Sequence, residues 1–314
     1  MLPRWVENGG YDWEWRLFVR LRVLGLVMVL AAVGVVGCHR ANKPVKSATS
    51  HYAVRGVVVA TDAASGEIGL NAEAIPGYME AMTMSYKLAD PTVMSELHVG
   101  DRITATLLFE TDAAGPINMR LAEVVVIAQA RPDYVPKVQY HVPAAGDVVP
   151  DFVLLNQSGK KIGLGQFKGK VLVMTFVYTR CPLADYCPRM SRNFAVIDKD
   201  LSGDKKLYAA THLLSVSFDP TYDTPKVLKS YGEAYTGEYS KATFGHWEFA
   251  APEAAEMTKM EEFFSLGVTP GDNGTLQHSL STLVIGKDGR VAAFYPTNDW
   301  TVGEVEAEIR KAAA

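Results

Sequence analysis

A proline-rich stretch, Arg131–Pro150, divides the chain into two parts with different hydrophobic patterns. Before this stretch, apolar and polar residues alternate over short segments, which is typical of strands. After it, strand-like and helix-like segments follow one another, which is typical of an α/β domain. Prolines at this density favour a semi-extended linker. The 314-residue chain is therefore expected to fold as two domains joined by a linker at 129–150.

The first domain is predicted over 52–128 as an all-β, OB-like small barrel. Turn signals such as Pro76-Gly77 and Gly100-Asp101 separate its strand-like segments. Five short strands in about 75 residues favour closure into a barrel, because closure removes free sheet edges. The predicted strands are Tyr52–Ala60, Glu67–Asn71, Met82–Leu88, Arg102–Glu110 and Ile117–Ile127.

The second domain, 151–314, is predicted as α/β, with a mostly parallel sheet and helices on both faces. Asp223-Thr224-Pro225 offers a capping residue and a first-turn proline, and Thr301–Glu304 matches a capping box. The predicted strands are Val171–Val177, Leu213–Phe218, Ser281–Ile285 and Val291–Phe294. The predicted helices are Pro188–Leu201, Thr224–Tyr235, Pro252–Leu266 and Val302–Ala313.

Residues 1–38 have the pattern of a secretory signal segment. Their uncharged apolar run, Val23–Gly37, is shorter than the roughly 20 residues of a membrane span. It leads into Val35-Val36-Gly37-Cys38, which resembles a bacterial lipobox and implies that Cys38 is lipidated. An uncleaved anchor helix that starts near Leu17 is the alternative. Either interpretation predicts a protein of the bacterial cell envelope that is anchored to the membrane and faces the periplasm, with 39–51 as a tether.

Two cysteines remain for chemistry, Cys181 and Cys187, shortly after the apolar run Val171–Val177. In an oxidising compartment they can form a structural disulfide, but so short a loop constrains the unfolded chain only weakly. Cys181 is expected at a strand's carboxyl end near a helix N-terminus, where a thiolate is favoured. His278, alone, is more typical of a surface or capping residue. Together the two thiols and this imidazole form a soft donor set suited to copper, and the thiols alone suit disulfide exchange.

The cysteine region resembles the Sco/SenC family of thioredoxin-fold copper proteins. The matching segments are Phe176–Pro182, Cys187–Ser191, Ser217–Tyr231 and His278–Leu280. The resemblance implies that Cys181, Cys187 and His278 bind Cu(I) or Cu(II), and that the two thiols also form a redox-active disulfide. It implies Asp219 as an outer-sphere or transient ligand. The family usually has three residues between its cysteines, whereas five intervene here, so this loop must turn before the sulfurs can meet.

Met79, Met82 and Met84 form a cluster in the predicted barrel. Met82 and Met84 would share one face of a strand, and thioethers suit Cu(I). Methionine also fills cores well, so a structural role is the alternative. The segment Ile75–Met84 resembles the CusF-like copper-binding domain, an OB-type barrel. This resemblance implies paired thioether ligands at Met82 and Met84. Met79 lies near the position at which that family has a tryptophan that caps the metal. Ala72 stands where that family has a histidine ligand.

These features predict a copper chaperone whose barrel captures Cu(I) and passes it to the thiols. The Sco resemblance implies that the acceptor is the CuA centre of a cytochrome c oxidase, or another cuproprotein. A thioredoxin-like reductant would keep both thiols reduced. One alternative is a thiol–disulfide oxidoreductase acting on an apo copper site, with Cys181 attacking and Cys187 resolving; another is copper sequestration by the methionine domain. A formal net charge of −4 without a basic run argues against a nucleic-acid partner.

Overall fold

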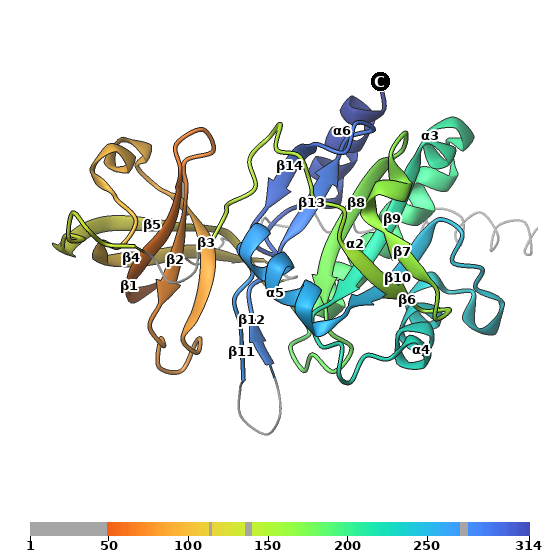
Figure 1. Ribbon diagram of the computed structural model, residues 1–314, viewed down its shortest axis with the longest axis horizontal. Helices are drawn as coiled ribbons and strands as arrows, with labels where there is room; N and C mark the ends of the chain where they lie inside the picture. The colour runs from red at the N-terminus through yellow and green to blue at the C-terminus, as the bar shows by residue number, and fades with distance from the viewer. Residues whose placement is uncertain (1–48, 113–114, 136–139, 271–275) are drawn as a thin grey trace, which may run out of the picture. The chain divides into compact units, whose positions relative to one another are not determined.

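Five strands of the first domain close into a barrel in the order β1-β2-β3-β5-β4 (Figure 1). They are β1 (Thr49–Asp62), β2 (Glu67–Ala72), β3 (Met82–Leu88), β4 (Arg102–Asp112) and β5 (Gly115–Ala128), with a 3-10 helix, η1 (Pro91–Glu96), between β3 and β4. β1 pairs with both β2 and β4. Inward residues such as Val58, Leu70, Leu107 and Leu121 are fully buried, as expected when alternate side chains fill a small barrel. The predicted OB-like barrel is confirmed.

The computed structural model describes residues 49–112, 115–135, 140–270 and 276–314. All of these residues belong to one compact unit. Within them, none of the helices combines the length and the apolar character needed to cross a bilayer. The signal segment and Cys38 lie outside the described residues, so lipidation stays a prediction.

The second domain is built on one sheet of seven strands in the order β14-β13-β8-β9-β10-β6-β7 (Figure 1). They are β6 (Val153–Asn156), β7 (Lys161–Gly163), β8 (Val171–Val177), β9 (Thr211–Ser217), β10 (Trp247–Pro252), β13 (Thr282–Ile285) and β14 (Val291–Tyr295). Only the central strands β8, β9 and β10 are parallel. The strands on either side of these three pair antiparallel, so the prediction of a mostly parallel sheet is wrong for the outer strands. Short turns connect β6 to β7 and β13 to β14, and such turns join only antiparallel strands.

Helices cover both faces of this sheet, as predicted. They are α2 (Cys187–Ser202), α3 (Lys205–Ala209), α4 (Pro225–Thr236), α5 (Ala254–Phe263) and α6 (Val302–Ala313). Thr175 of β8 bonds to Thr282, whose hydroxyl lies 3.9 Å from the sulfur of Met190 in α2. Phe176, the next residue of β8, packs against Phe264 at the end of α5, with ring centroids 5.2 Å apart. Because successive strand residues face opposite sides, α2 and α5 lie on opposite faces.

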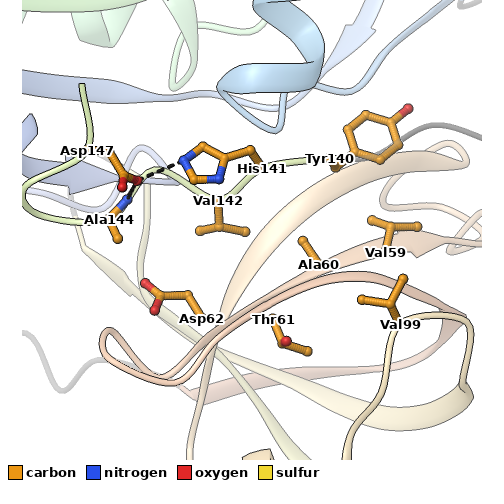
Figure 2. A pocket seen from close by; sticks show the side chains of 10 residues that line it. All are labelled: Val59, Ala60, Thr61, Asp62, Val99, Tyr140, His141, Val142, Ala144 and Asp147. Carbon is orange, nitrogen blue, oxygen red and sulfur yellow. Dashed lines mark hydrogen bonds and ion pairs between the residues drawn. The ribbon is translucent and has the colours of Figure 1, made fainter. Parts of the chain in front are cut away.

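The linker is fastened to the second domain. Its described residues, 131–135 and 140–150, form no helix or strand. Figure 2 shows the His141 ring and the Asp147 carboxylate facing each other, with Nε2 and Oδ2 2.8 Å apart. The Ala144 amide donates to the same carboxylate, and the His141 main-chain N–H donates to a carbonyl of α5. His141 therefore anchors the linker to the second domain.

A two-stranded sheet, β11 (Val268–Pro270) and β12 (Leu276–His278), stands apart from the main sheet. Val268 is directly opposite His278 in this antiparallel pair. Strands of three residues carry too little periodicity to be found from sequence, and neither was predicted. This hairpin, named the histidine hairpin below, ends four residues before β13 and fixes the position of His278.

Candidate metal centre

Cys181, Cys187 and His278 come together in the structure. Their ligand atoms all lie within 4.8 Å of one another, and no other described set of three His, Cys or acidic residues forms such a group. The Cys187 sulfur is 3.4 Å from His278 Nε2. Both cysteines are free thiols. The five-residue loop between the cysteines therefore still lets both sulfurs and the imidazole meet at one place.

The inter-cysteine loop, residues 182–186, is held in place by two side chains from the same domain. Asn298 is buried, and its Nδ2 donates to the Asp185 carbonyl at 2.7 Å. Arg192 donates to the Ala184 carbonyl at 3.0 Å. Both bonds satisfy main-chain carbonyls that the irregular loop leaves outside a helix or sheet. The loop is thereby fixed at two points before Cys187 begins α2.

A buried carboxylate ties the ends of the two central strands beneath Cys181. Asp223, 1% exposed, accepts hydrogen bonds from the main-chain N–H and the hydroxyl of Thr179, just after β8. It also accepts a bond of 2.6 Å from the hydroxyl of Ser217, the last residue of β9. The sequence suggested a helix cap at this place, but the N-cap residue of α4 is Thr224 and it makes no side-chain capping bond. Asp223 instead positions the loop that carries Cys181.

Replacing Asp223 with alanine is expected to lower the free energy of unfolding by about 2–4 kcal/mol. Three donors would lose their acceptor, and a buried unsatisfied donor costs about 1–3 kcal/mol. Urea denaturation measures the effect. Asp133→Ala, at an exposed position, is the matched control. Equal unfolding midpoints for the two variants would contradict this role.

His278 presents one ring nitrogen to the sulfurs. Its Nδ1 lies 2.9 Å from the carbonyl of Ser279, so Nδ1 carries the proton and donates. Nε2 then has a free lone pair directed at Cys187. Metal-binding histidines are commonly oriented by such a hydrogen bond from the ring nitrogen that does not bind the metal. The rings of Phe218 and Tyr178 enclose the imidazole, with centroids 4.2 and 5.3 Å away.

The two thiols have different acidities because their surroundings differ. Hydrogen bonding from the Cys187 thiol lowers the pKa of Cys181 to about 4, against the opposing effect of partial burial. Complete burial raises the pKa of Cys187 well above its usual value. Cys181 is therefore the thiolate, and it is also the more exposed of the two. Cys187 is the proton-bearing partner behind it.

Asp219 is held away from this ligand group. Its carboxylate binds the guanidinium of Arg180 at 2.6 Å, and that guanidinium lies 4.0 Å above the ring of Tyr222. The set of converging ligand atoms does not include Asp219. Its role as an outer-sphere or transient ligand stays a prediction, and direct ligation would require Arg180 to release the carboxylate.

The donor set fits copper better than a hard cation. Two sulfurs and one imidazole nitrogen are soft or intermediate ligands, and no carboxylate joins them in the group. A small cavity opens beside the site, lined mainly by Tyr178, Pro182, Leu183 and Tyr186. Cys181, Leu276 and His278 also line this cavity.

The methionine cluster lies in the barrel core. Met82 and Met84 are buried, and Met79 packs against them from the loop before β3. The hydroxyl of Tyr86 lies 3.6 Å from the sulfur of Met84 and 3.8 Å from that of Met79. Ala72 is directly opposite Met82 in the sheet, so the position of the family's histidine adjoins the cluster but supplies no ligand. Tyr86 was missed, although its period-two spacing from Met84 could have revealed it.

Comparisons with known proteins identify the families of both domains. The SCO1/SenC family model matches residues 141–314, more than half of the chain, and the model of the copper binding periplasmic protein CusF matches 51–119. The SCO1 protein homolog of Bacillus subtilis (strain 168) is 27% identical over 150 residues, covering 47% of this chain and 72% of the relative.

Two solved structures are similar over the Sco-like part. A SCO1/SenC family lipoprotein from Bacillus anthracis str. Ames shows 26% identity and a TM-score of 0.46, covering 56% of this chain and 99% of that one. BsSco, described as a member of the Sco family of cytochrome c oxidase assembly proteins, shows 25% identity and a TM-score of 0.44, covering 56% and 98%. Given the family match over residues 141–314, the chain belongs to the SCO1/SenC family of copper-binding proteins, and it carries a CusF-like domain before its thioredoxin-like domain.

Proposed function

We propose that this protein is a copper chaperone of the bacterial cell envelope that delivers copper to the CuA centre of a cytochrome c oxidase. The observation that carries the proposal is the convergence of Cys181, Cys187 and His278 into one soft donor group. Two thiolates and a neutral imidazole bind Cu(I) without requiring any other ligand from the chain. Copper is the cargo of such a protein.

The geometry gives the cargo an exit. Cys181 and His278 both line a surface cavity, and Cys181 is the more exposed of the two, whereas Cys187 is wholly buried. An incoming thiolate of an acceptor therefore meets the Cys181 side of the ion first. Ligand exchange would proceed by replacing Cys181, then the two buried ligands, with Cu(I) bound to sulfur throughout.

The acceptor and the location rest on relatives and on the sequence. BsSco is described as belonging to a family of oxidase assembly proteins, and the Bacillus anthracis relative as a lipoprotein. CusF is described as periplasmic. With the lipobox-like residues before Cys38, these descriptions support a lipid-anchored protein on the outer side of the cytoplasmic membrane.

A thiol–disulfide oxidoreductase is the second candidate, and the acidities of the thiols favour it. A half-buried thiolate with a pKa of about 4 beside a fully buried thiol with a raised pKa suits an attacking and a resolving cysteine. Cys181 would attack the disulfide of an apo copper site, and Cys187 would then release the mixed disulfide. A thioredoxin-like reductant would restore both thiols.

Metal counting tests the chaperone. The reduced protein is loaded with excess Cu(I), desalted and assayed for bound copper. We expect the Cys181→Ser form to lose the copper of the thiol site, and the Met82→Ala/Met84→Ala form to keep it. Equal copper contents in wild type and Cys181→Ser would exclude the thiol site as a carrier.

His278→Ala separates the chaperone from the reductase. Removal of one ligand is expected to lower Cu(I) affinity at least about 10-fold, since even outer-sphere changes commonly cost 10–100-fold. Reduction of a disulfide peptide needs only the thiols and should persist. Competition with a chromophoric Cu(I) chelator and a thiol-exchange assay measure the two properties. Loss of exchange with full copper retention would reverse the assignment.

Sequestration by the methionine cluster predicts a different phenotype. If copper storage were the main function, replacing Met79, Met82 and Met84 with leucine would sensitise cells to copper and leave oxidase assembly intact. For a chaperone, the Cys181→Ser form should instead lower oxidase activity at limiting copper. Growth on graded copper and oxidase assays of the same strains distinguish these outcomes.

A further inference from the structure

Strand β3 of the barrel touches the segment that leads into the histidine hairpin. Met82 and Met84 face the barrel core, yet the alternate residues Thr83 and Ser85 are also buried, at 6% and 2% exposed. A Cβ atom added at Gly267 would lie 2.1 Å from the carbonyl oxygen of Thr83 and 2.6 Å from its nitrogen. Only glycine permits the two main chains to approach this closely.

Gly267 is bonded in turn to the residue that orients His278. Its carbonyl accepts a hydrogen bond of 2.9 Å from the Ser279 amide, and its own amide donates to the Ser279 hydroxyl at 2.9 Å. The carbonyl of Ser279 accepts the Nδ1 proton of His278. The strand that carries the thioethers is therefore in contact with the support of the metal-binding imidazole.

Tyr186 lies beside the thiol site. It is the last residue of the five-residue inter-cysteine loop, and its ring meets the His278 ring edge-on at a centroid distance of 6.5 Å. Burial is the main reason that the pKa of Tyr78 is raised, and the next is the nearby Tyr186 phenol. Tyr186 also contributes to the raised pKa of Tyr86, after burial and Tyr78. Tyr186 therefore lies near both the imidazole and the tyrosine that contacts the thioethers.

We infer that Cu(I) passes from the methionine cluster to the thiol site within one chain, with the Gly267–Thr83 contact and Tyr186 holding the two sites together for the transfer. This inference rests on the proposed function. It gives the inter-cysteine loop a role, because the last residue of that loop, Tyr186, contacts the His278 ring and lies near Tyr78 and Tyr86. It also accounts for a glycine at position 267.

The transfer is a ligand exchange without redox change. Bonds from Cu(I) to the thioethers of Met79, Met82 and Met84 break as bonds to the two cysteine sulfurs and His278 Nε2 form. Cys181 enters as a thiolate, and Cys187 releases its thiol proton to water. Thiolates hold Cu(I) more strongly than neutral thioethers, so the direction is downhill. The ion stays Cu(I) throughout.

The test follows copper at both sites in the reduced full-length protein. Half an equivalent of Cu(I) is added under argon. Methyl resonances of 13C-labelled methionine report the barrel, and ultraviolet absorption from thiolate–Cu(I) charge transfer reports the thiol site. In wild type, we expect the methionine signals to shift and then return as the thiolate absorption rises. The rate of that rise should not depend on protein concentration.

Gly267→Ala should slow this rise at least about 10-fold, because the added Cβ atom would force β3 away from the segment that supports His278. The linker still holds both sites on one chain at an effective concentration near 1 mM, so the slower rise should remain independent of protein concentration at about 10 μM. Tyr186→Ala should act in the same direction and does not depend on how the Gly267 variant folds. Gly303→Ala is the matched control, since a Cβ atom there meets nothing within 4 Å.

Equilibrium titrations keep the two proposals apart. Cys181→Ser/Cys187→Ser reports the barrel alone, and Met79→Leu/Met82→Leu/Met84→Leu reports the thiol site alone. A thiol site that binds no Cu(I) would end the chaperone proposal. A barrel that binds none, or wild-type transfer rates in both Gly267→Ala and Tyr186→Ala with both sites binding, would overturn the transfer and leave the chaperone intact.

Discussion

Cys187→Ala is expected to lower Cu(I) affinity of the thiol site by more than about 100-fold, since loss of an outer-sphere partner alone commonly costs 10–100-fold. Cys187 is wholly buried at the first position of α2, and its sulfur faces His278. Alanine leaves Cys181 and the imidazole as a two-ligand site. Competition against a chromophoric Cu(I) chelator measures the change. Val196→Ala, on the exposed face of the same helix, is the control.

The same variant should also change the acidity of Cys181. The hydrogen bond from Cys187 is the largest cause of the low pKa of Cys181, about 4. Without it, the alkylation rate of Cys181 should titrate at least about one pH unit higher, because a hydrogen bond to the charged form is lost. Iodoacetamide modification across pH 3–9 shows the midpoint. An unchanged midpoint together with unchanged copper affinity would mean that the two sulfurs do not act as one site.

Segments with a clear hydrophobic period were predictable from the sequence, and short segments were not. β3, β8 and α6 have the bounds that the sequence indicated, because each is a continuous alternating, apolar or amphipathic run. β10 was missed since Pro252 at its end suggested a helix start, although α5 begins at Ala254. β6, β7, β11 and β12 have three or four residues each, too few to show a period. Their pairing is decided by tertiary contacts.

The candidate ligand group was predictable from the sequence, but most of the side chains that support it were not. Cys181, Cys187 and His278 carry a recognisable motif, and soft donors in one sequence pattern limit the chemistry. The bonds from Asn298 to the inter-cysteine loop and from Thr179 to Asp223 join residues 113 and 44 positions apart. Asn and Asp side chains commonly make local turn and capping bonds, so sequence alone favours the local role. Only the folded structure shows which distant residue each of these side chains bonds to.

Glu67→Gln is expected to make the protein more stable at pH 8 and to remove a stability loss between about pH 4.5 and 7. Glu67 opens β2, is 2% exposed, and its Oε2 has no hydrogen-bond partner. Burial raises its pKa from 4.5 to about 7; Asp62 and Asp299 add to the rise, and Lys87 opposes it. The folded protein therefore keeps a proton on Glu67 over a pH range in which the unfolded chain has lost it.

The direction follows from proton binding. Between pH 4.5 and 7 the folded state holds more protons at this site than the unfolded state, so stability falls as pH rises through the folded pKa. A shift of this size corresponds to about 3–4 kcal/mol. Glutamine is neutral at both ends of the range, so it retains the stability that the protonated glutamate has at pH 4.5.

Calorimetric melting of wild type and Glu67→Gln at pH 5 and pH 8 measures this difference. We expect the variant to melt about 6–16 °C higher at pH 8 and within about 2 °C of wild type at pH 5, given about 2–4 °C per kcal/mol for domains of this size. Glu96→Gln, at an exposed position, should change neither value. A variant that melts lower than wild type at pH 8 would show that ionised Glu67 stabilises the barrel, through Lys87, more than burial penalises it.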